Sequence, residues 1–353
     1  MTKLTQDPGP AYFNPIIIAA LREKEMDVVF SLLSTLGGKG MAPSNVVFEK
    51  FINMCSGLDG EVNINIRSLF KYFREFNWLP DQELAHQIEE LFVGSKTENW
   101  KCHWTIVDKS GVCQCCKHRL GRIVLTDADF QNLQQQFLTS TLIGENVYLK
   151  SNPEEVERFK DFIQEYAPFD VVVDALNVAA FCRSNMLRKV VEFFARYHHK
   201  RVLVIGREHM QRSLGRNLQP IMRMASTFFT DNISKDDPFT LYAAIYSGKS
   251  TMLVSNDYMR DHKCLLSPNL QGVFERWQRS RQISMKKVHH DNFVFQMPLK
   301  YDSGPQEDSN GWHVPYEDCS QRAVYEHPNT YLCLRAKKRP QKRSKKETDG
   351  RAN

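Results

Sequence analysis

The chain has 353 residues, 42% of them hydrophobic, and a formal net charge of +6. This length predicts two or three domains with substantial cores, and no apolar run approaches the roughly 20 residues of a membrane-spanning helix. Nine cysteines, an odd number scattered along the chain, argue against a disulfide framework and favour a reducing compartment.

The positive charge is unevenly distributed. From Arg335 to the end there are nine Lys or Arg and two acids, a net of +7, so the other 334 residues sum to about −1. Residues 183–223 are locally basic, with ten Lys or Arg against two Glu. Such a stretch is either a surface that steers nucleic acid or a solvated helix face.

Residues 1–100 are predicted to be all-helical. Three segments there have similar openings, which carry Pro10, Pro43 and Pro80 at spacings of 33 and 37 residues. A proline fits the start of a helix, and a period near 35 residues built from helix pairs is typical of a repeat solenoid. An irregular helical domain is the alternative.

Residues 101–125 change character, with short apolar pieces among cysteines and small polar residues, and predict a β-rich element tied by metal. Cys113 and Cys116 have the CxxC spacing of a zinc site, which needs four ligands. The remaining ligands could be local or distant. The local candidates are Cys102, His103, Cys115 and His118, and the distant ones are His313 and Cys333.

From residue 150 onward, strand-like and helix-like segments alternate, which predicts a parallel sheet with helices on both faces. The predicted strands are 169–176, 200–206, 226–232 and 250–257. The predicted helices are 150–165, 184–199, 211–225, 237–248 and 258–266. Residues 270–335 lose this rhythm, and only 293–301 and 331–336 are expected to be short strands.

Several acids fall where the predicted strands end. Asp174 ends the first strand and Asp257 the fourth, while Asp231 ends the third and Asp261 follows the fourth by about one helical turn. Ligands of open parallel sheets collect at the carboxyl ends of strands, so these acids should converge on one edge.

Asp236 and Asp237 stand just before Pro238, at a predicted helix start, and belong to the same set of acids. Clustered carboxylates repel one another unless a divalent cation neutralises them, and oxygen ligands suit Mg²⁺ or Mn²⁺. Such a cluster commonly supports phosphoryl chemistry. The alternative for this pair is simple capping of the helix.

Together these motifs resemble the proteinaceous, RNA-free RNase P family in its animal mitochondrial form. The resemblance is carried by the stretches "FDVVVDALNVA", "SKDDPFTLYAAIYSG", "SNDYMRDHKCLL", "GWHVPYED" and "YLCL". The order of helical repeats, CxxC pair, nuclease segment and final His and Cys also matches, so the resemblance covers residues 1–335.

The resemblance implies a fold in three parts. Residues 1–100 would be a pentatricopeptide-type α-helical solenoid. Residues 101–149 with 300–336 would form a zinc-stapled β-rich central element, and 150–299 an α/β metallonuclease domain of the PIN-like (NYN) kind with a parallel sheet. Residues 337–353 are expected to be a disordered basic tail.

The resemblance also implies roles for individual residues. The implied catalytic residues, which would bind Mg²⁺ or Mn²⁺, are Asp174, Asp236, Asp237 and Asp257, with His262 near that site. The implied structural zinc ligands are Cys113, Cys116, His313 and Cys333. One position departs from the family pattern, because Ala175 stands where Gly usually follows the first aspartate. Its methyl group could tighten the cleft.

The activity implied is an endoribonuclease that removes the 5′ leader of precursor tRNA and leaves a 5′ phosphate, with the repeats gripping the tRNA elbow. The resemblance further implies a location in the mitochondrial matrix, although no presequence is visible at Met1. No association with a membrane is expected. The implied partners are a tRNA methyltransferase subunit and a short-chain dehydrogenase subunit. Two rivals stay open: another Mg²⁺-dependent ribonuclease that acts on mRNA or rRNA, and an RNA-binding protein whose nuclease site has lapsed.

Overall fold

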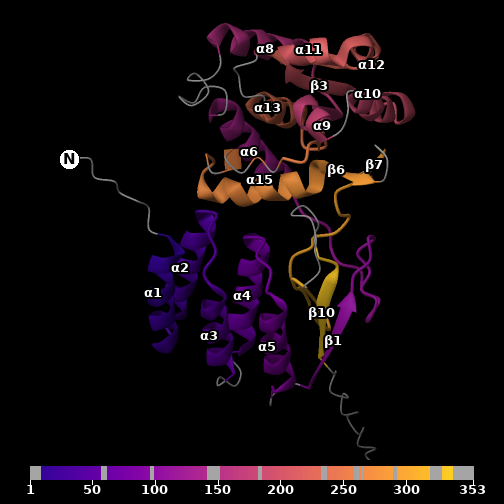
Figure 1. The fold of residues 1–353 in the computed structure, drawn as a ribbon. Helices are drawn as coiled ribbons and strands as arrows, with labels where there is room; N and C mark the ends of the chain where they lie inside the picture. The colour runs from indigo at the N-terminus through magenta and orange to yellow at the C-terminus, as the bar shows by residue number, and fades with distance from the viewer. Residues whose placement is uncertain are drawn as a thin grey trace, which may run out of the picture.

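A computed structural model of the chain combines an N-terminal group of helices, a four-stranded sheet and a six-stranded sheet covered by helices (Figure 1). The described residues are 9–56, 62–95, 99–140, 152–181, 185–231, 237–257, 259, 262–263, 265–288, 292–318 and 328–336.

The N-terminal group is all-helical where it is described, as predicted. Its helices are α1 (Pro10–Arg22), α2 (Met26–Gly38), α3 (Asn45–Cys55), α4 (Val62–Glu75) and α5 (Gln82–Val93). Pro10 is the first residue of α1, where a missing backbone N–H costs nothing. Pro43 and Pro80 each lie two residues ahead of a helix, α3 and α5.

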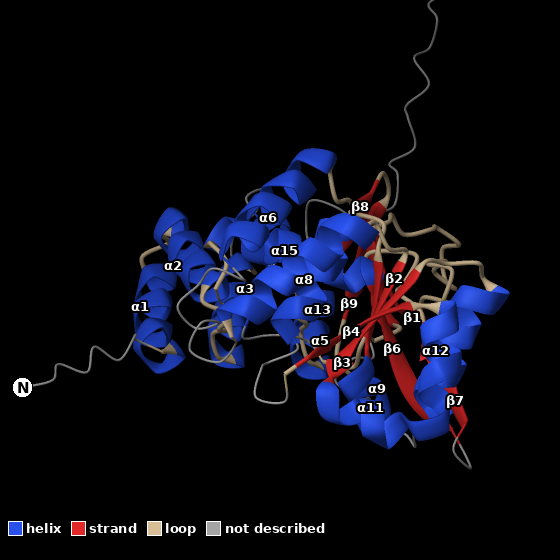
Figure 2. Ribbon diagram, turned by 90° about the horizontal axis from the view of Figure 1, so that it is seen from above, coloured by secondary structure: helices blue, strands red, loops and turns tan. Residues whose placement is uncertain are grey.

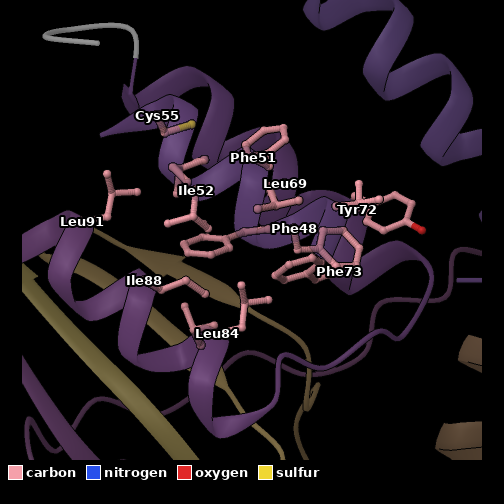
Figure 3. Packing of buried hydrophobic residues seen from close by; sticks show 14 of the residues in the cluster. Phe48, Phe51, Ile52, Cys55, Leu69, Tyr72, Phe73, Leu84, Ile88 and Leu91 are labelled. Atoms are coloured by element: carbon pink, nitrogen blue, oxygen red, sulfur yellow. The ribbon is translucent and has the colours of Figure 1, made fainter. Parts of the chain in front are cut away.

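These helices share one apolar core with the neighbouring sheet. Phe48 of α3 is fully buried, with ring centroids 5.2 Å from Phe73 and 4.2 Å from Trp78. Figure 3 shows Leu84 and Ile88 of α5 facing this cluster from the opposite side. The same core continues into the four-stranded sheet through Trp312, Val314, Leu332 and Leu334.

The four-stranded sheet is antiparallel, in the order β1-β10-β9-β8. Its strands are β1 (Trp100–Ile106), β8 (Gln306–Asp308), β9 (Gly311–Pro315) and β10 (Thr330–Ala336). In chain order, β1 precedes the whole of the six-stranded sheet, and β8, β9 and β10 follow it. The register pairs Cys333 with His313, so these two side chains lie side by side on one face.

The six-stranded sheet has the order β4-β3-β2-β5-β6-β7 and is parallel except for the edge strand β7. Its strands are β2 (Val171–Asp174), β3 (Val202–Arg207), β4 (Ser226–Thr230), β5 (Met252–Val254), β6 (Gln282–Val288) and β7 (Asn292–Gln296). The chain winds outward from β2 through β3 to β4, then returns to β5 on the other side of β2. The winding therefore reverses between β2 and β5, where α/β proteins place their ligands.

Helices cover both faces of this sheet, as the alternation predicted (Figure 2). One face is covered by α6 (Asp127–Ser140), α8 (Pro153–Tyr166), α13 (Asp237–Ser247) and α15 (Pro268–Arg281). The other is covered by α9 (Ala175–Phe181), α10 (Asn185–Val191), the π-helical turn Glu192–Tyr197, α11 (Glu208–Leu214), the 3₁₀ turn Gly215–Asn217 and α12 (Leu218–Met224). Val172 points to the first face and Val173 to the second, so β2 is buried on both sides.

The structure corrects the prediction that residues 270–335 lack regular alternation. Helix α15 and strand β6 continue the α/β pattern, and β8 and β9 belong to the four-stranded sheet. The apolar face of α15 has helical spacing at Leu270, Val273, Phe274 and Trp277, so the sequence carried the signal. The helix predicted over 258–266 is only partly described: residues 258, 260, 261 and 264 lie outside the described residues, and helical backbone is present at 262–263.

Candidate active site and zinc centre

Asp174 is the last residue of β2 and lies at the point where the winding of the sheet reverses. Only 3% of it is exposed, and a buried carboxylate is unfavourable unless it accepts hydrogen bonds or binds a cation. One carboxylate oxygen accepts a hydrogen bond from the backbone N–H of Asn177 at 2.9 Å, at the start of α9. The other accepts one from the Ser255 hydroxyl at 2.9 Å.

Ser255 links Asp174 to a second candidate, Asp257. The Ser255 hydroxyl donates to Asp174 and accepts from the backbone N–H of Asp257 at 3.0 Å. The Asp257 carboxylate in turn accepts the backbone N–H of Met259 at 2.7 Å, which closes the turn after β5. The Asp174 carboxylate and the backbone of Asp257 are thus joined through one buried hydroxyl group, a connection that sequence reasoning missed.

The turn that carries Asp257 is held by Asn256. The Asn256 side chain donates to the Met285 carbonyl at 3.0 Å and accepts from the Met285 N–H at 2.6 Å, and so takes the place of a strand peptide beside β6. The Asn256 backbone N–H donates to the Asn177 side chain at 2.8 Å. Gln282 donates to the carbonyls of Ser255 and Asp257. These bonds fix the switch point before any metal or substrate binds.

The structure describes some of the remaining candidate residues and leaves others outside the described part of the chain. Asp237 is the first residue of α13, the helix that follows β4 and packs on β2, so it lies at the same sheet edge. His262 follows β5 in a half-buried position. Asp236 and Asp261 lie outside the described residues. The described aspartates are not brought close enough to form a group of three that could hold an ion.

Asp231 has a structural role at the end of β4. Its backbone N–H donates to the carboxylate of Glu155, which is 1% exposed, and its own carboxylate lies 3.8 Å from Arg158. Both partners are on α8. Glu155, which sequence reasoning missed, therefore anchors the start of the 231–237 connection that carries the second pair of candidate acids.

The methyl group of Ala175 is accommodated by a glycine on the neighbouring strand. Ala175 is fully buried within the core on the α10–α12 side of the sheet. A Cβ added at Gly206 of β3 would lie 3.1 Å from the Ala175 methyl carbon and 3.0 Å from the sulfur of Met210. The methyl group thus packs toward β3 in the core.

The second candidate site gathers Cys113, Cys116, His313 and Cys333, whose ligand atoms all lie within 4.8 Å of one another. Cys113, His313 and Cys333 are completely buried. Three thiols and one imidazole in this arrangement fit a structural zinc ion, which prefers tetrahedral sulfur and nitrogen ligands. Across the described part of the chain, this is the one group of His, Cys, Asp or Glu side chains close enough to hold an ion.

The local alternative for zinc is not assembled. The Cys102 sulfur faces the Glu89 carbonyl on α5 at 3.9 Å, and Cys115 is exposed. Cys102 and His103 also follow one another on β1, so their side chains point to opposite faces of the sheet. The distant pair, His313 and Cys333, completes the set instead and joins the CxxC loop to β9 and β10.

The buried thiols of Cys113 and Cys333 change each other's pKa in opposite directions. The pKa of Cys113 lies far below its usual range, chiefly because Cys333 donates a hydrogen bond to it, and the pKa of Cys333 is raised for the same reason. Arg335 donates to the sulfurs of Cys116 at 2.6 Å and Cys333 at 3.2 Å. It also donates two bonds of 2.6 Å to Asp308. The guanidinium group contacts the same sulfur atoms that would bind zinc, and Asp308 holds it beside them.

The basic stretch 183–223 lies mainly on the helices that cover the second face of the six-stranded sheet. Arg188 pairs with Glu192 at 3.1 Å, and Arg201 donates to the Tyr166 carbonyl at 2.7 Å. The exposed cations are Lys189, Arg196, Lys200, Arg201, Arg212, Arg216 and Arg223. This face therefore presents positive charge to solvent.

None of the described helices combines the length and apolar character needed to cross a membrane.

Comparisons with known proteins point to one family. A sequence model of the family described as protein-only RNase P matches residues 107–333, which contain the candidate aspartates, His262 and the Cys113, Cys116, His313 and Cys333 group. The mitochondrial ribonuclease P catalytic subunits of Mus musculus and Rattus norvegicus are each 31% identical over 342 residues, covering 94% of this chain and 58% of the relative. The chain therefore spans less than two thirds of the length of these relatives.

A plant relative and the solved structure of a second plant protein are also similar to this chain. Proteinaceous RNase P 1, chloroplastic/mitochondrial, of Arabidopsis thaliana is 27% identical over 260 residues, or 69% of this chain and 43% of the relative. The crystal structure of nuclear proteinaceous RNase P 2 from A. thaliana superposes with a TM-score of 0.61 at 18% identity, covering 94% of this chain and 76% of that one. At this identity the likeness concerns the fold alone.

Proposed function

Since the chain belongs to the protein-only RNase P family, we propose that it is an endoribonuclease that removes the 5′ leader of precursor tRNA. One observation carries the proposal: Asp174 and Asp257 are joined through Ser255 at the switch point of a parallel sheet, within the region that matches the family. This is the place where such a sheet binds ligands, and it is held rigidly by side chains of its own.

We assign the catalytic metal to Asp174, Asp236, Asp237 and Asp257. Bound Mg²⁺ (or Mn²⁺) would neutralise the carboxylates, act as a Lewis acid at the phosphate and activate the attacking water. The protein's own part is to hold the Asp174 carboxylate through the Ser255 hydroxyl and the Asn177 N–H, and the Asp257 carboxylate through the Met259 N–H. His262 is assigned to the rim of this site. Hydrolysis would leave a 5′ phosphate on the tRNA and a 3′ hydroxyl on the leader.

The other parts of the chain take supporting roles in this proposal. The helices α1–α5 act as pentatricopeptide-type repeats that hold the tRNA elbow, and the α/β part is a PIN-like nuclease domain. Structural Zn²⁺ bound by Cys113, Cys116, His313 and Cys333 fixes the four-stranded sheet between them. Because α6 packs its Phe130, Leu133 and Phe137 into the nuclease core, we extend that domain to include α6.

We also propose the setting of the reaction. The rodent relatives are named as mitochondrial, and from this we infer a mitochondrial location for the present chain. They are also named as catalytic subunits, so we propose that this chain works with other subunits, namely a tRNA methyltransferase and a short-chain dehydrogenase. The basic face on α10–α12 would attract the RNA backbone, and its contribution should weaken as salt rises.

Product mapping tests the proposal. An internally labelled mitochondrial precursor tRNA is incubated with the chain in Mg²⁺ or EDTA, with and without the two partner subunits, and the ends of the fragments are identified. The expected result is one Mg²⁺-dependent cut at the mature 5′ end, leaving a 5′ phosphate. Faster cleavage of mRNA or rRNA fragments would favour another ribonuclease activity. Binding without any cut would favour a lapsed nuclease.

A further inference from the structure

A buried carboxylate outside both candidate sites lies where three parts of the molecule meet. Asp302 follows β7 and precedes β8, and it is 4% exposed. It lies between α4 of the N-terminal helices and α15 of the nuclease domain. Figure 1 shows α15 running between the N-terminal helices and the six-stranded sheet.

The Asp302 carboxylate bonds to an arginine from each neighbouring part. One oxygen accepts from Nε of Arg74, on α4, at 2.8 Å. The other accepts from Nη2 of Arg279, on α15, at 3.0 Å, and from the backbone N–H of Gly304 at 3.0 Å. Arg279 also donates to the Ser303 hydroxyl at 2.7 Å. A single carboxylate thus joins the N-terminal helices to the nuclease domain.

The backbone that presents this carboxylate is itself fixed to the zinc-bearing element. The Asp302 N–H donates to the Gly121 carbonyl at 2.8 Å, and the Asp302 carbonyl accepts from the Gln306 side chain at 2.6 Å. Gln306 in turn accepts the Gly121 N–H at 2.8 Å. The carboxylate therefore cannot follow one arginine when the two helices move apart.

The contact with α4 is also close at the backbone. A Cβ added at Gly304 would lie 2.9 Å from Cγ and 3.3 Å from Cα of Arg74, so only a glycine lets the two segments approach this closely. Burial alone would raise the pKa of Asp302, but Arg279, Gly304 and Arg74 outweigh it and lower the pKa. The carboxylate is therefore ionised at neutral pH and binds both guanidinium groups as an anion.

A nearby ion pair between α4 and β8 shows what an exposed link from the N-terminal helices contributes. Arg67 of α4 and Glu307 of β8 lie 2.6 Å apart, but their side chains are 50% and 38% exposed. Exposed pairs of this kind contribute little to stability, because water and salt screen them. The side chains of Asp302 and Arg279 are 6% and 12% exposed, so removing one partner leaves a buried charge uncompensated.

We propose that Asp302, Arg74 and Arg279 form a positioning latch that fixes the N-terminal helices relative to the switch-point carboxylates. The functional half of this inference rests on the proposed tRNA activity. If the repeats hold the tRNA elbow, the latch sets the distance from the elbow to the scissile phosphate. The three residues are positioning residues, because none of them lies at the candidate catalytic site.

The latch can be tested without RNA. Fluorescent dyes are attached through genetically encoded amino acids at the exposed positions Lys50 of α3 and Asn132 of α6, and the distance distribution is measured by single-molecule energy transfer. We expect Asp302→Asn to broaden or shift the distribution, and Glu307→Gln to leave it as in the wild type. A wild-type distribution in folded, zinc-containing Asp302→Asn would overturn the latch.

A second variant covers the case in which Asp302→Asn does not fold. Arg74→Gln removes only the half-exposed partner and leaves the bond between Asp302 and Arg279 intact. It should shift the same distance distribution. If Arg74→Gln keeps the wild-type distribution and melts like the wild type, the latch is wrong whatever happens to the other variant.

A kinetic comparison then tests the link to the reaction. Misplacement of reacting groups by about 1 Å can cost about 100-fold, so we expect the latch variants to lose roughly tenfold or more in kcat/KM on a full precursor tRNA. A minihelix that lacks the elbow should lose less than about twofold. Equal losses on both RNAs would overturn the positioning role. If the wild type cleaves neither RNA, the proposed function fails, while the distance measurement still decides the latch.

Discussion

The two sheets of the molecule are stabilised in different ways. The six-stranded sheet has an extensive apolar core on each face. The four-stranded sheet shares the large core of the N-terminal helices on one face, but its other face buries a small cluster, Val107, Cys113, Leu120, Tyr301, Tyr331 and Cys333. Two members of that small cluster are zinc-ligand candidates.

This difference separates the sources of stability. Burying one large apolar side chain contributes about 1.5–3 kcal/mol, so we expect the six-stranded sheet, with a large core on each face, to fold without a metal. A face with so few apolar residues needs another source, and structural zinc supplies binding energy directly to folding. The proposed catalytic edge belongs to the sheet with two large apolar cores, and the proposed zinc site belongs to the other sheet.

Loss of a zinc ligand should have the largest effect. Cys333→Ser removes a buried ligand on β10, and since structural zinc binding is worth about 10–16 kcal/mol in zinc-finger peptides, we expect loss of the metal and unfolding of the four-stranded sheet. Zinc content and thermal unfolding measure this. Cys115→Ser, an exposed thiol in the same loop, is the matched control and should keep both. Stoichiometric zinc in Cys333→Ser would contradict the assignment.

A cavity in the core of the six-stranded sheet should have the next largest effect, and this effect should not depend on metal. The fully buried ring of Phe159 has its centroid 4.9 Å from those of Phe228 and Phe239, so Phe159→Ala should cost about 3–5 kcal/mol of unfolding free energy. Denaturant unfolding with and without a zinc chelator measures the loss. Val294→Ala, at an exposed position, is the control. If the loss of unfolding free energy disappears when zinc is removed, the two sheets do not differ in their dependence on zinc.

Removal of the bridging hydroxyl should affect activity more than stability. Ser255→Ala leaves Asp174 and Asp257 without their shared hydrogen-bond partner. Loss of a residue that orients a metal ligand typically costs about 10–100-fold in metal affinity or activity. We therefore expect cleavage to slow by about 10–100-fold and the Mg²⁺ concentration at half-maximal activity to rise. Ser213→Ala, whose hydroxyl only bonds within α11, is the control. An unchanged Mg²⁺ dependence would show that Ser255 does not hold the metal-binding carboxylates.

The smallest effect is expected at Ala175. Because its methyl group packs against Gly206 in the core, Ala175→Gly should cost about 1 kcal/mol of stability and change cleavage by less than about twofold. The reciprocal change, Gly206→Ala, overfills the same space and should cost about 1–3 kcal/mol. Stability and single-turnover rates measure both. Much faster cleavage by Ala175→Gly would mean that the methyl group does crowd the active site.

The two regions also differ in how far their sequences predict them. The apolar runs around 171–174 and 202–206 between amphipathic helices predicted the parallel sheet, and the chain order of strands placed Asp174 and Asp257 at one edge. The sequence spacing alone could not decide between the local and the distant zinc ligands, because His313 and Cys333 become neighbours only through strand pairing. The family resemblance, not the residue pattern, favoured them.

Other features could not be read from the sequence. Ser255, Asn256 and Glu155 act through hydrogen bonds to residues about 29 to 81 positions away, and no local pattern marks a polar residue with such a partner. Asp302 is similar, because its partners Arg74 and Arg279 come from different parts of the chain. By contrast, the helical spacing of Phe130, Leu133 and Phe137 was a readable signal for α6.

Single-turnover cleavage of a 5′-labelled mitochondrial precursor tRNA by the wild type and Asp257→Asn tests the central claim most directly. With Mg²⁺ and the partner subunits present, we predict one cut at the mature 5′ end by the wild type. Asp257→Asn should still bind the RNA but cleave about 10²–10⁴-fold more slowly, the range for losing one directly acting group. Equal rates for the two proteins, or a wild type that binds the precursor and leaves it intact, would contradict the account.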